Sequence, residues 1–274
     1  MVNDKKINKE IEDYYSSGVE ENRLSVDIFQ LEQVRTKEII SRYLSQIPLK
    51  ILDVGGGTGV YSFWLRDQGH EVHLIDPVPF NVEIAKEHSL STGKILSSLS
   101  LGEAHNLEFD DDYFDLVLFL GPLYHITERS ERINALKEAK RVMRKNGIIL
   151  CAAISRFASM IDGFCRNLIK DPRFVMIMDH DLRYGQHRNT TDEKEYFTTA
   201  FFHHPYELKE EIKEACLALQ KIIAVESFGS MLSDFNERWQ IKEFQELLLD
   251  TIRRIEEDST LLGLSNHLLA VARK

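Results

Sequence analysis

The sequence of 274 residues contains only three cysteines and six prolines, and it has no run of about 18 apolar residues. The lack of such a run excludes a membrane-spanning helix. Cys151, Cys165 and Cys216 show neither CxxC spacing nor nearby paired histidines, which argues against a disulfide framework and a zinc site. We expect all three to be reduced, buried small residues, and we expect no metal site. The start, "MVNDKKINKEIEDYYSSG", lacks the apolar core of a signal peptide, which predicts a cytoplasmic protein.

Positive charge is also scarce, since 34 Lys and Arg face 44 Asp and Glu for a formal net charge of -10. A nucleic acid would therefore meet net repulsion unless the protein had a local basic patch. The most basic stretch, residues 137–147, has its bases at the helical spacing typical of a solvated face. These charges disfavour a nucleic-acid partner, and they give no indication of the oligomeric state.

The order of apolar segments predicts an α/β fold. Short apolar runs alternate with helix-length amphipathic stretches from residue 49 onward, as in a Rossmann-like, mostly parallel sheet with helices on both faces. The clearest helix is predicted at residues 128–145, because Ile133, Leu136 and Ala139 lie on one stripe and Gly147 follows the last turn. Seven strands are predicted, at residues 50–55, 71–76, 93–101, 114–121, 147–154, 221–228 and 267–274.

Three segments lie outside this alternation and suggest a cap embedded in a single domain. Ligands of open α/β sheets bind beyond the carboxyl ends of the strands, and segments inserted after the fifth and sixth strands can reach that edge. We therefore divide the chain into five parts: a helical cap at 1–46, a cofactor-binding core at 47–154, a lid insertion at 155–204, and a C-terminal part of the sheet at 205–274 that contains a second helical insertion at 231–262.

A glycine-rich turn, "ILDVGGGTGVYSFW" at 51–64, joins the first predicted strand to the first helix, where phosphates often bind. A P-loop requires a lysine directly after the glycines, but the next lysine is Lys86. A dinucleotide fingerprint counted from Gly55 requires a small residue where this chain has Val60. Both phosphate-binding motifs are thus disfavoured, and with them an NAD-dependent oxidoreductase.

The remaining pattern is an acid followed by alternating glycines: Asp53, Gly55, Gly57 and Gly59. The acid can accept hydrogen bonds from an ammonium group, and the glycines let a flat, uncharged group lie against the backbone. The pattern favours a cationic ligand without phosphate. It resembles the first motif of the class I S-adenosylmethionine-dependent methyltransferases.

Further motifs carry this resemblance over residues 49–154. Asp76 ends the second predicted strand 23 positions after Asp53, where the family's acid accepts the ribose hydroxyls. The resemblance implies that Glu103 accepts from the adenine amino group and that the Ala104 backbone N–H donates to the ring, although the family usually has Asp at that acid. The last two predicted strands complete the family's seven-stranded sheet. By the same resemblance, the backbone of Leu120 holds the amino-acid end of the cofactor.

The loop "LGPLYHI", 120–126, follows the fourth predicted strand, where this family often places groups that face the substrate. His125 is our candidate general base, with Tyr124 as an orienting hydroxyl. The loop is similar to that of a subgroup of uncharacterised bacterial methyltransferases that share an N-terminal "YY". Tyr15, in this pair, is predicted to cover the cofactor.

The resemblance implies an enzyme that moves a methyl group from S-adenosyl-L-methionine to an O, N or S atom of a small molecule by in-line displacement, leaving S-adenosyl-L-homocysteine. The alternatives are an RNA or protein methyltransferase and a non-catalytic S-adenosylmethionine-binding protein. In the insertion, His180, Asp181, His203 and His204 form polar clusters that we interpret as packing or surface groups, not as metal ligands.

Overall fold

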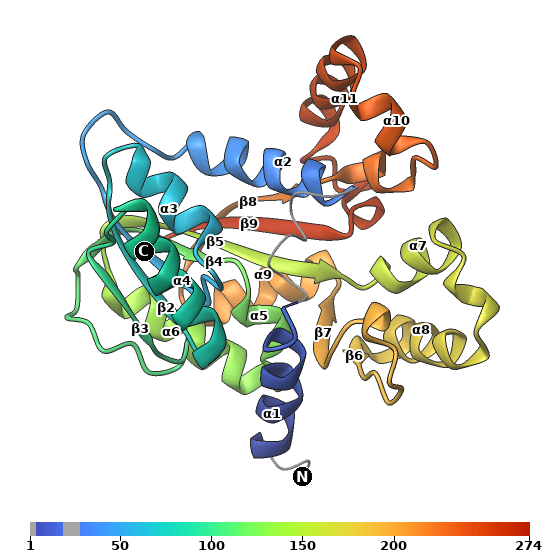
Figure 1. The fold of residues 1–274 in the computed structure, drawn as a ribbon, viewed down its shortest axis with the longest axis horizontal. Helices are drawn as coiled ribbons and strands as arrows, with labels where there is room; N and C mark the ends of the chain where they lie inside the picture. Colours follow the sequence, from blue (N-terminus) through green and yellow to red (C-terminus); the bar gives the residue numbers. More distant parts are fainter. Residues whose placement is uncertain (1–3, 19–27) are drawn as a thin grey trace.

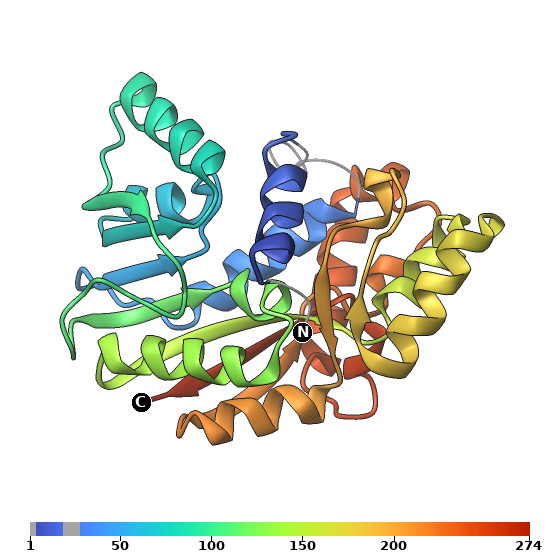
Figure 2. The same cartoon turned by 90° about the horizontal axis from the view of Figure 1, so that it is seen from below.

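The computed structural model describes residues 4–18 and 28–274, so parts of the predicted N-terminal cap, 1–3 and 19–27, lie outside the described residues. The described chain forms a nine-stranded sheet with helices on both faces (Figures 1 and 2). Its central order is β3-β2-β1-β4-β5-β9-β8, with β1 to β5 parallel and β9 antiparallel to both of its neighbours. These strands are β1 Lys50–Val54, β2 Glu71–Asp76, β3 Ser98–Leu101, β4 Phe114–Phe119, β5 Met143–Ser155, β8 Ala218–Ala224 and β9 His267–Arg273.

All seven predicted strands are present, and two short strands from the insertion extend the sheet. β7 (Ala200–His203) pairs in parallel with the end of β5, where Phe202 lies opposite Ile154, and β6 (Gln186–His187) pairs with β7. The four residues of β7 are buried. An apolar run of this kind gains stability from burial at a sheet edge, so the end of the insertion belongs to the sheet.

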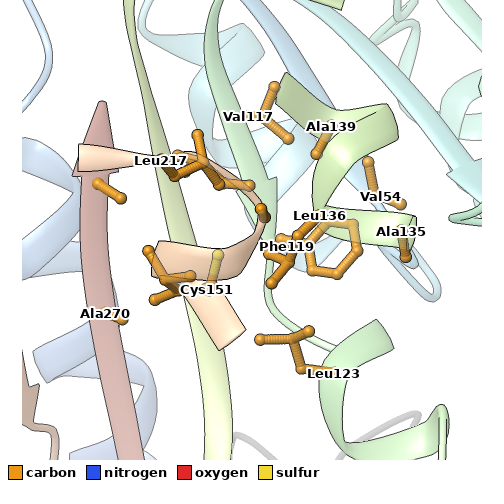
Figure 3. Packing of buried hydrophobic residues seen from close by; sticks show 14 of the residues in the cluster. Val54, Val117, Phe119, Leu123, Ala135, Leu136, Ala139, Cys151, Leu217 and Ala270 are labelled. Carbon is orange, nitrogen blue, oxygen red and sulfur yellow. The ribbon is translucent and has the colours of Figure 1, made fainter. Parts of the chain in front are cut away.

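Two buried clusters cover the two faces of the sheet. On one face, α6 (Arg129–Val142) and α9 (Pro205–Glu214) pack against the strands, and Figure 3 shows Leu136 and Ala139 of α6 beside Val117 and Phe119 of β4. On the other face lie α2 (Phe29–Ser41), α3 (Val60–Asp67) and α4 (Pro79–Thr92). The helix predicted at 128–145 ends at Val142.

The remaining helices flank the carboxyl edge of the sheet. The insertion supplies α7 (Ala158–Cys165) and α8 (Pro172–Tyr184), while α10 (Phe235–Trp239) and α11 (Lys242–Ile255) pack on Leu31 of α2 (Figure 1). The N-terminal α1 (Asp4–Tyr15) lies beside α5 (Pro122–His125) and β7 (Figures 1 and 2). Among the described helices, none is long and apolar enough to cross a membrane.

The cysteines correct one expectation. All three are free, and Cys151 is buried in the sheet, but Cys165 and Cys216 are exposed. Cys165 ends α7 and Cys216 follows α9, so both lie at helix ends on the surface. The prediction that every cysteine is buried was therefore wrong for these two.

Candidate functional site

A cavity of about 370 Å³ lies at the carboxyl ends of the strands. The glycine turn after β1, the end of β2 and the loop after β4 form its walls, and α1 contributes Ile11, Glu12 and Tyr15. All but one of the predicted site residues line this cavity, Gly59 being the exception. The lining predicted residues are Asp53, Gly55, Gly57, Asp76, Glu103, Ala104, Leu120, Tyr124, His125 and Tyr15.

The glycine turn is shaped by backbone conformation and close packing. Gly55 and Gly57 have positive φ, 68° and 57°, which residues with a Cβ rarely adopt. At Gly56, a Cβ would lie 2.8 Å from the Asp53 carboxyl carbon, so this residue, which the motif did not single out, is also constrained. Gly59 has φ 90° and precedes α3, where a Cβ would lie 2.7 Å from the Phe63 ring. Gly59 therefore shapes the turn and the start of α3 without lining the cavity.

Asp76 is held by three donors from its surroundings. Its carboxylate accepts hydrogen bonds from Gly57 N at 2.8 Å, Val78 N at 2.9 Å and Asn81 Nδ2 at 3.1 Å. Burial raises the pKa of this carboxyl, and these donors act in the opposite direction. The side chain is fixed at the cavity wall. Val78 N and Asn81 Nδ2 both donate to Oδ1, so Oδ2, which accepts only from Gly57 N, keeps acceptor capacity.

Asp53 is almost fully enclosed, with 1% of its surface exposed. Burial raises the pKa of Asp53 to about 7, the hydrogen bond from Ser62 Oγ at 2.7 Å opposes this rise, and the nearby Asp76 charge adds to it. A cation bound beside Asp53 would favour the ionised carboxylate and so offset the free-energy cost of burying its charge.

The charge of the cavity lining has one sign. None of the described residues that line it is Lys or Arg. Its carboxylates are Glu12, Glu32, Asp53, Asp76 and Glu103. These carboxylates fit a cofactor that carries an ammonium and a sulfonium group. The described lining offers no cationic side chain that could pair with a pyrophosphate.

The raised pKa of Asp53 predicts pH-dependent cofactor binding. A cationic ligand binds best to the ionised carboxylate, so the Kd for S-adenosylmethionine should rise about tenfold for each pH unit below 7. The folded-state pKa also lies above the unfolded value, so this group's contribution to the stability of the free protein falls as pH rises from about 4 to about 7. Calorimetric titrations between pH 5.5 and 8 measure the first effect. An Asp53→Asn variant should lose this pH dependence, whereas equal slopes in both proteins would contradict the assignment.

Glu103 and Ala104, which we predicted to contact the adenine, both line the cavity. Glu103 is half-exposed, and its carboxylate lies 2.8 Å from His105 Nε2. His105 also lines the cavity, although nothing in the sequence motif pointed to it. Ala104 lies between these two residues, and Leu120 follows β4 directly.

The tyrosine hydroxyl that contacts His125 is that of Tyr15, not that of Tyr124 as the sequence analysis suggested. The Tyr15 hydroxyl lies 2.6 Å from His125 Nε2, and His125 Nδ1 lies 3.3 Å from the Thr199 carbonyl oxygen. Because a carbonyl only accepts, Nδ1 donates to Thr199 and Nε2 accepts the Tyr15 proton. Desolvation by the surrounding protein lowers the pKa of His125 to about 4, so the imidazole is neutral at pH 7. Tyr124 instead meets the His125 ring edge-on, with centroids 4.7 Å apart.

Contacts join α1, which contributes residues to the cavity lining, to the insertion. Thr199 Oγ1 donates to Glu10 Oε2 at 2.8 Å, and the Tyr14 and Phe197 rings meet edge-on at 5.5 Å. Phe197 has φ 68°, a strained conformation for a bulky residue, which such contacts hold in place. No sequence pattern indicated this arrangement, because the two segments are more than 180 residues apart.

The polar residues of the insertion lie away from the cavity lining. His180, Asp181, His203 and His204 are all absent from it. Asp181 is fully buried and bonds His187 Nδ1 at 2.7 Å, while His203 Nε2 lies 3.2 Å from Glu211. Both contacts lie outside the cavity lining.

Comparison with known proteins identifies the core. Residues 52–151 match the family model described as a methyltransferase domain. The curated relatives include the ubiquinone/menaquinone biosynthesis C-methyltransferases UbiE of Neisseria meningitidis serogroup C and of Chromobacterium violaceum. Both are 34% identical, over 117 and 118 residues, which is 42% of this chain and 46% and 47% of theirs. The chain thus spans just under half the length of the curated relatives it matches.

Solved structures show the same fold over most of the chain. A methyltransferase from Methanosarcina mazei matches with TM-score 0.58 and 18% identity, covering 86% of this chain and 96% of its own. A Thermotoga maritima protein described as a possible histamine N-methyltransferase gives TM-score 0.58 and 17% identity, with coverage of 95% and 98%. A geranyl diphosphate C-methyltransferase from Streptomyces coelicolor, in complex with S-adenosyl-L-homocysteine, gives 0.54 and 11%, with coverage of 88% and 79%.

Proposed function

Since the chain carries a class I S-adenosylmethionine-dependent methyltransferase domain, we propose that the protein methylates a small molecule in the cavity at the carboxyl edge of the sheet. The observation that carries the proposal is the pair of buried carboxylates, Asp53 and Asp76, in a cavity whose described lining has no Lys or Arg. In our proposal the acceptor atom is O, N or S. The UbiE relatives are named C-methyltransferases, so a carbon acceptor should be tested as well.

We assign the cofactor-binding roles within this cavity by residue. Asp53 binds the ammonium group of the cofactor, and Asp76 accepts its ribose hydroxyls. The adenine lies near Glu103 and Ala104, and the backbone of Leu120 holds the amino-acid end. S-adenosyl-L-methionine, when bound, supplies the methyl group from its sulfonium. The absence of Cβ atoms at the glycine turn lets the cofactor lie against the backbone.

We propose that His125 acts through Tyr15. With a pKa of about 4, His125 is a weak base at neutral pH, but its Nε2 fixes the direction of the Tyr15 hydroxyl proton. In this arrangement the Tyr15 oxygen holds the acceptor's O–H or N–H beside the methyl group. Positioning of this kind supplies much of the acceleration of an in-line displacement.

Calorimetry with three ligands tests the cofactor assignment. We expect S-adenosylmethionine and S-adenosylhomocysteine to bind one per chain and NAD to show no saturable heat. The buried acids favour the sulfonium ligand, and no cationic side chain on the described lining can pair with the pyrophosphate. Tight NAD binding without binding of the sulfonium would overturn the proposal.

Catalysis needs its own measurement, because a non-catalytic S-adenosylmethionine-binding protein would pass the calorimetric test. We expect S-adenosylhomocysteine to accumulate when the protein is incubated with S-adenosylmethionine and a panel of small acceptors, including quinols, amines and thiols. Mass spectrometry of the products locates the methylated atom. Transfer only to RNA or protein would favour the alternative substrate class.

A further inference from the structure

Three side chains of the types that can ligate a metal come together from separate parts of the chain, and two of them line the cavity. Glu32 lies on α2, Glu226 follows β8, and His267 begins β9. One ligand atom of each lies within 4.8 Å of the others. His267 Nδ1 is 2.5 Å from Glu226 Oε1 and 3.9 Å from Glu32 Oε2. Glu32 and His267 line the cavity, as does Ala152 of β5, while Glu226 lies outside the lining.

The Glu226 carboxylate is oriented by the surrounding protein. Its Oε2 accepts from Ser265 Oγ at 2.8 Å and from His267 N at 3.0 Å, which directs Oε1 towards the His267 ring. Ser265 Oγ in turn accepts from the backbone N–H groups of Glu226 and Ser227, both at 3.0 Å. Partners of this type around a carboxylate are characteristic of metal ligands, whose direction they fix.

The cation nearest in sequence to Glu32 on α2 is Arg35, which bonds groups outside the cluster. The guanidinium of Arg35, on the same helix as Glu32, bonds the Val225 carbonyl oxygen at 3.2 Å, Glu38 at 2.7 Å, and Glu256. It is committed to those groups, and no Lys or Arg is among the described residues that line the cavity. Two carboxylates at one point of a partly desolvated cavity are stabilised by a positive charge between them.

Two other histidine–carboxylate groups provide a contrast. His187 bonds Asp181 through Nδ1, and its Nε2 donates to the Tyr196 carbonyl oxygen at 2.8 Å, so both ring nitrogens are used. Glu211, which contacts His203, is also paired with the buried Arg132. Neither group lines the cavity, whereas Glu32 and His267 do.

We propose that Glu32, Glu226 and His267 bind one divalent metal ion at the acceptor end of the cavity. A site of one imidazole and two carboxylates suits Zn²⁺, Mn²⁺ or Fe²⁺ better than Mg²⁺ or Ca²⁺, which prefer oxygen ligands alone. The 3.9 Å separation accommodates an ion bonded to both atoms at about 2.0–2.2 Å. The 2.5 Å hydrogen bond must open, and the His267 Nδ1 proton is released on binding.

This assignment deepens the proposed function, on which its catalytic meaning rests. With three protein ligands, the ion keeps open positions that an acceptor oxygen or nitrogen can occupy. The acceptors it would select are small molecules with a hydroxyl, carbonyl or amine that can coordinate a metal. In this proposal the acceptor is held on one side by the ion at Glu32, Glu226 and His267. On the other side it contacts Tyr15 and His125, which also line the cavity.

Calorimetry on untagged, EDTA-treated full-length protein tests the site with Zn²⁺ and Mn²⁺ as probes. We expect one ion per chain, with proton release that depends on the ionisation enthalpy of the buffer. Glu32→Gln and His267→Gln should each weaken binding more than tenfold. His180→Gln, at an exposed histidine outside the cavity, is the matched control and should bind as the wild type does. Thermal melts of all variants without metal report whether they fold.

The result is separated from the proposed function by measuring S-adenosylmethionine binding to the wild-type protein in parallel titrations. Intact cofactor binding with no metal binding would overturn the metal site alone. Failure of the cofactor to bind would instead overturn the proposed function. Loss of activity towards amines in Glu32→Gln, without any metal binding to the wild type, would also overturn the metal site and assign the cluster to a substrate ammonium group.

Discussion

Replacement of Asp76 by alanine should raise the Kd for S-adenosylmethionine about a hundredfold, or about 2.7 kcal/mol. In our proposal the carboxylate accepts from the ribose hydroxyls, and a hydrogen bond to a charged group contributes about 1.5–3 kcal/mol. The substitution also leaves Gly57 N, Val78 N and Asn81 Nδ2 without their acceptor, which loosens the wall of the cavity. Calorimetry at pH 8, where Asp53 is ionised, measures the change.

Asp67→Ala is the matched control, because Asp67 lies on α3 and pairs with Lys94 outside the cavity lining. It should leave the cofactor Kd unchanged. Since Asp76→Ala leaves buried donors unpaired, a thermal melt must accompany the titration to separate unfolding from lost contacts. A folded Asp76→Ala protein with wild-type affinity would refute the ribose assignment.

Turnover should fall about a hundredfold in His125→Ala, while the cofactor Kd changes no more than about threefold. The imidazole fixes the Tyr15 hydroxyl, so its removal releases the group that positions the acceptor. Tyr15→Phe removes only the hydroxyl and should give a similar fall in kcat, and the double variant should be no slower than either single one, because the two groups act as one unit. Single-turnover rates with saturating cofactor measure both effects.

His88→Ala provides the control for loss of an imidazole, since the exposed His88 contacts Phe63 and does not line the cavity. Tyr124→Phe tests the alternative orienting hydroxyl that the sequence suggested. If Tyr124→Phe slowed turnover and Tyr15→Phe did not, the pairing of Tyr15 with His125 would have no role in the reaction. Full activity of His125→Ala would remove both residues from the mechanism.

The sequence was sufficient for the parts of the molecule that local pattern determines. Strands such as β1 and β4 are apolar runs with clear ends, and the positive φ of Gly55 and Gly57 follows from a turn that only glycine adopts easily. Asp53 and Asp76 could be placed at one edge because parallel strands end on the same side of a sheet. The strands of the insertion were missed, because β6 has two residues and β7 four, too few for a recognisable period.

Contacts between distant segments could not be predicted from the same patterns. Tyr15 and His125 are 110 positions apart, and the approach of their side chains depends on how α1 is packed. Likewise Glu32, Glu226 and His267 have no motif spacing, because each comes from a different element. Their meeting depends on the order of β8 and β9 in the sheet, which hydrophobic patterning leaves open. The roles of these residues, the division into cap and lid, and the cytoplasmic location stay predictions.

The one-signed charge of the cavity has a consequence for the end of the catalytic cycle. Methyl transfer removes the positive charge of the sulfonium, so the product S-adenosylhomocysteine has less attraction to the carboxylates of the lining than the substrate cofactor. The partial desolvation that raises the pKa of Asp53 strengthens this difference, because screening by water is weaker there. In our proposal, the charges that recruit the cofactor therefore also limit product inhibition and favour exchange of spent cofactor for fresh cofactor.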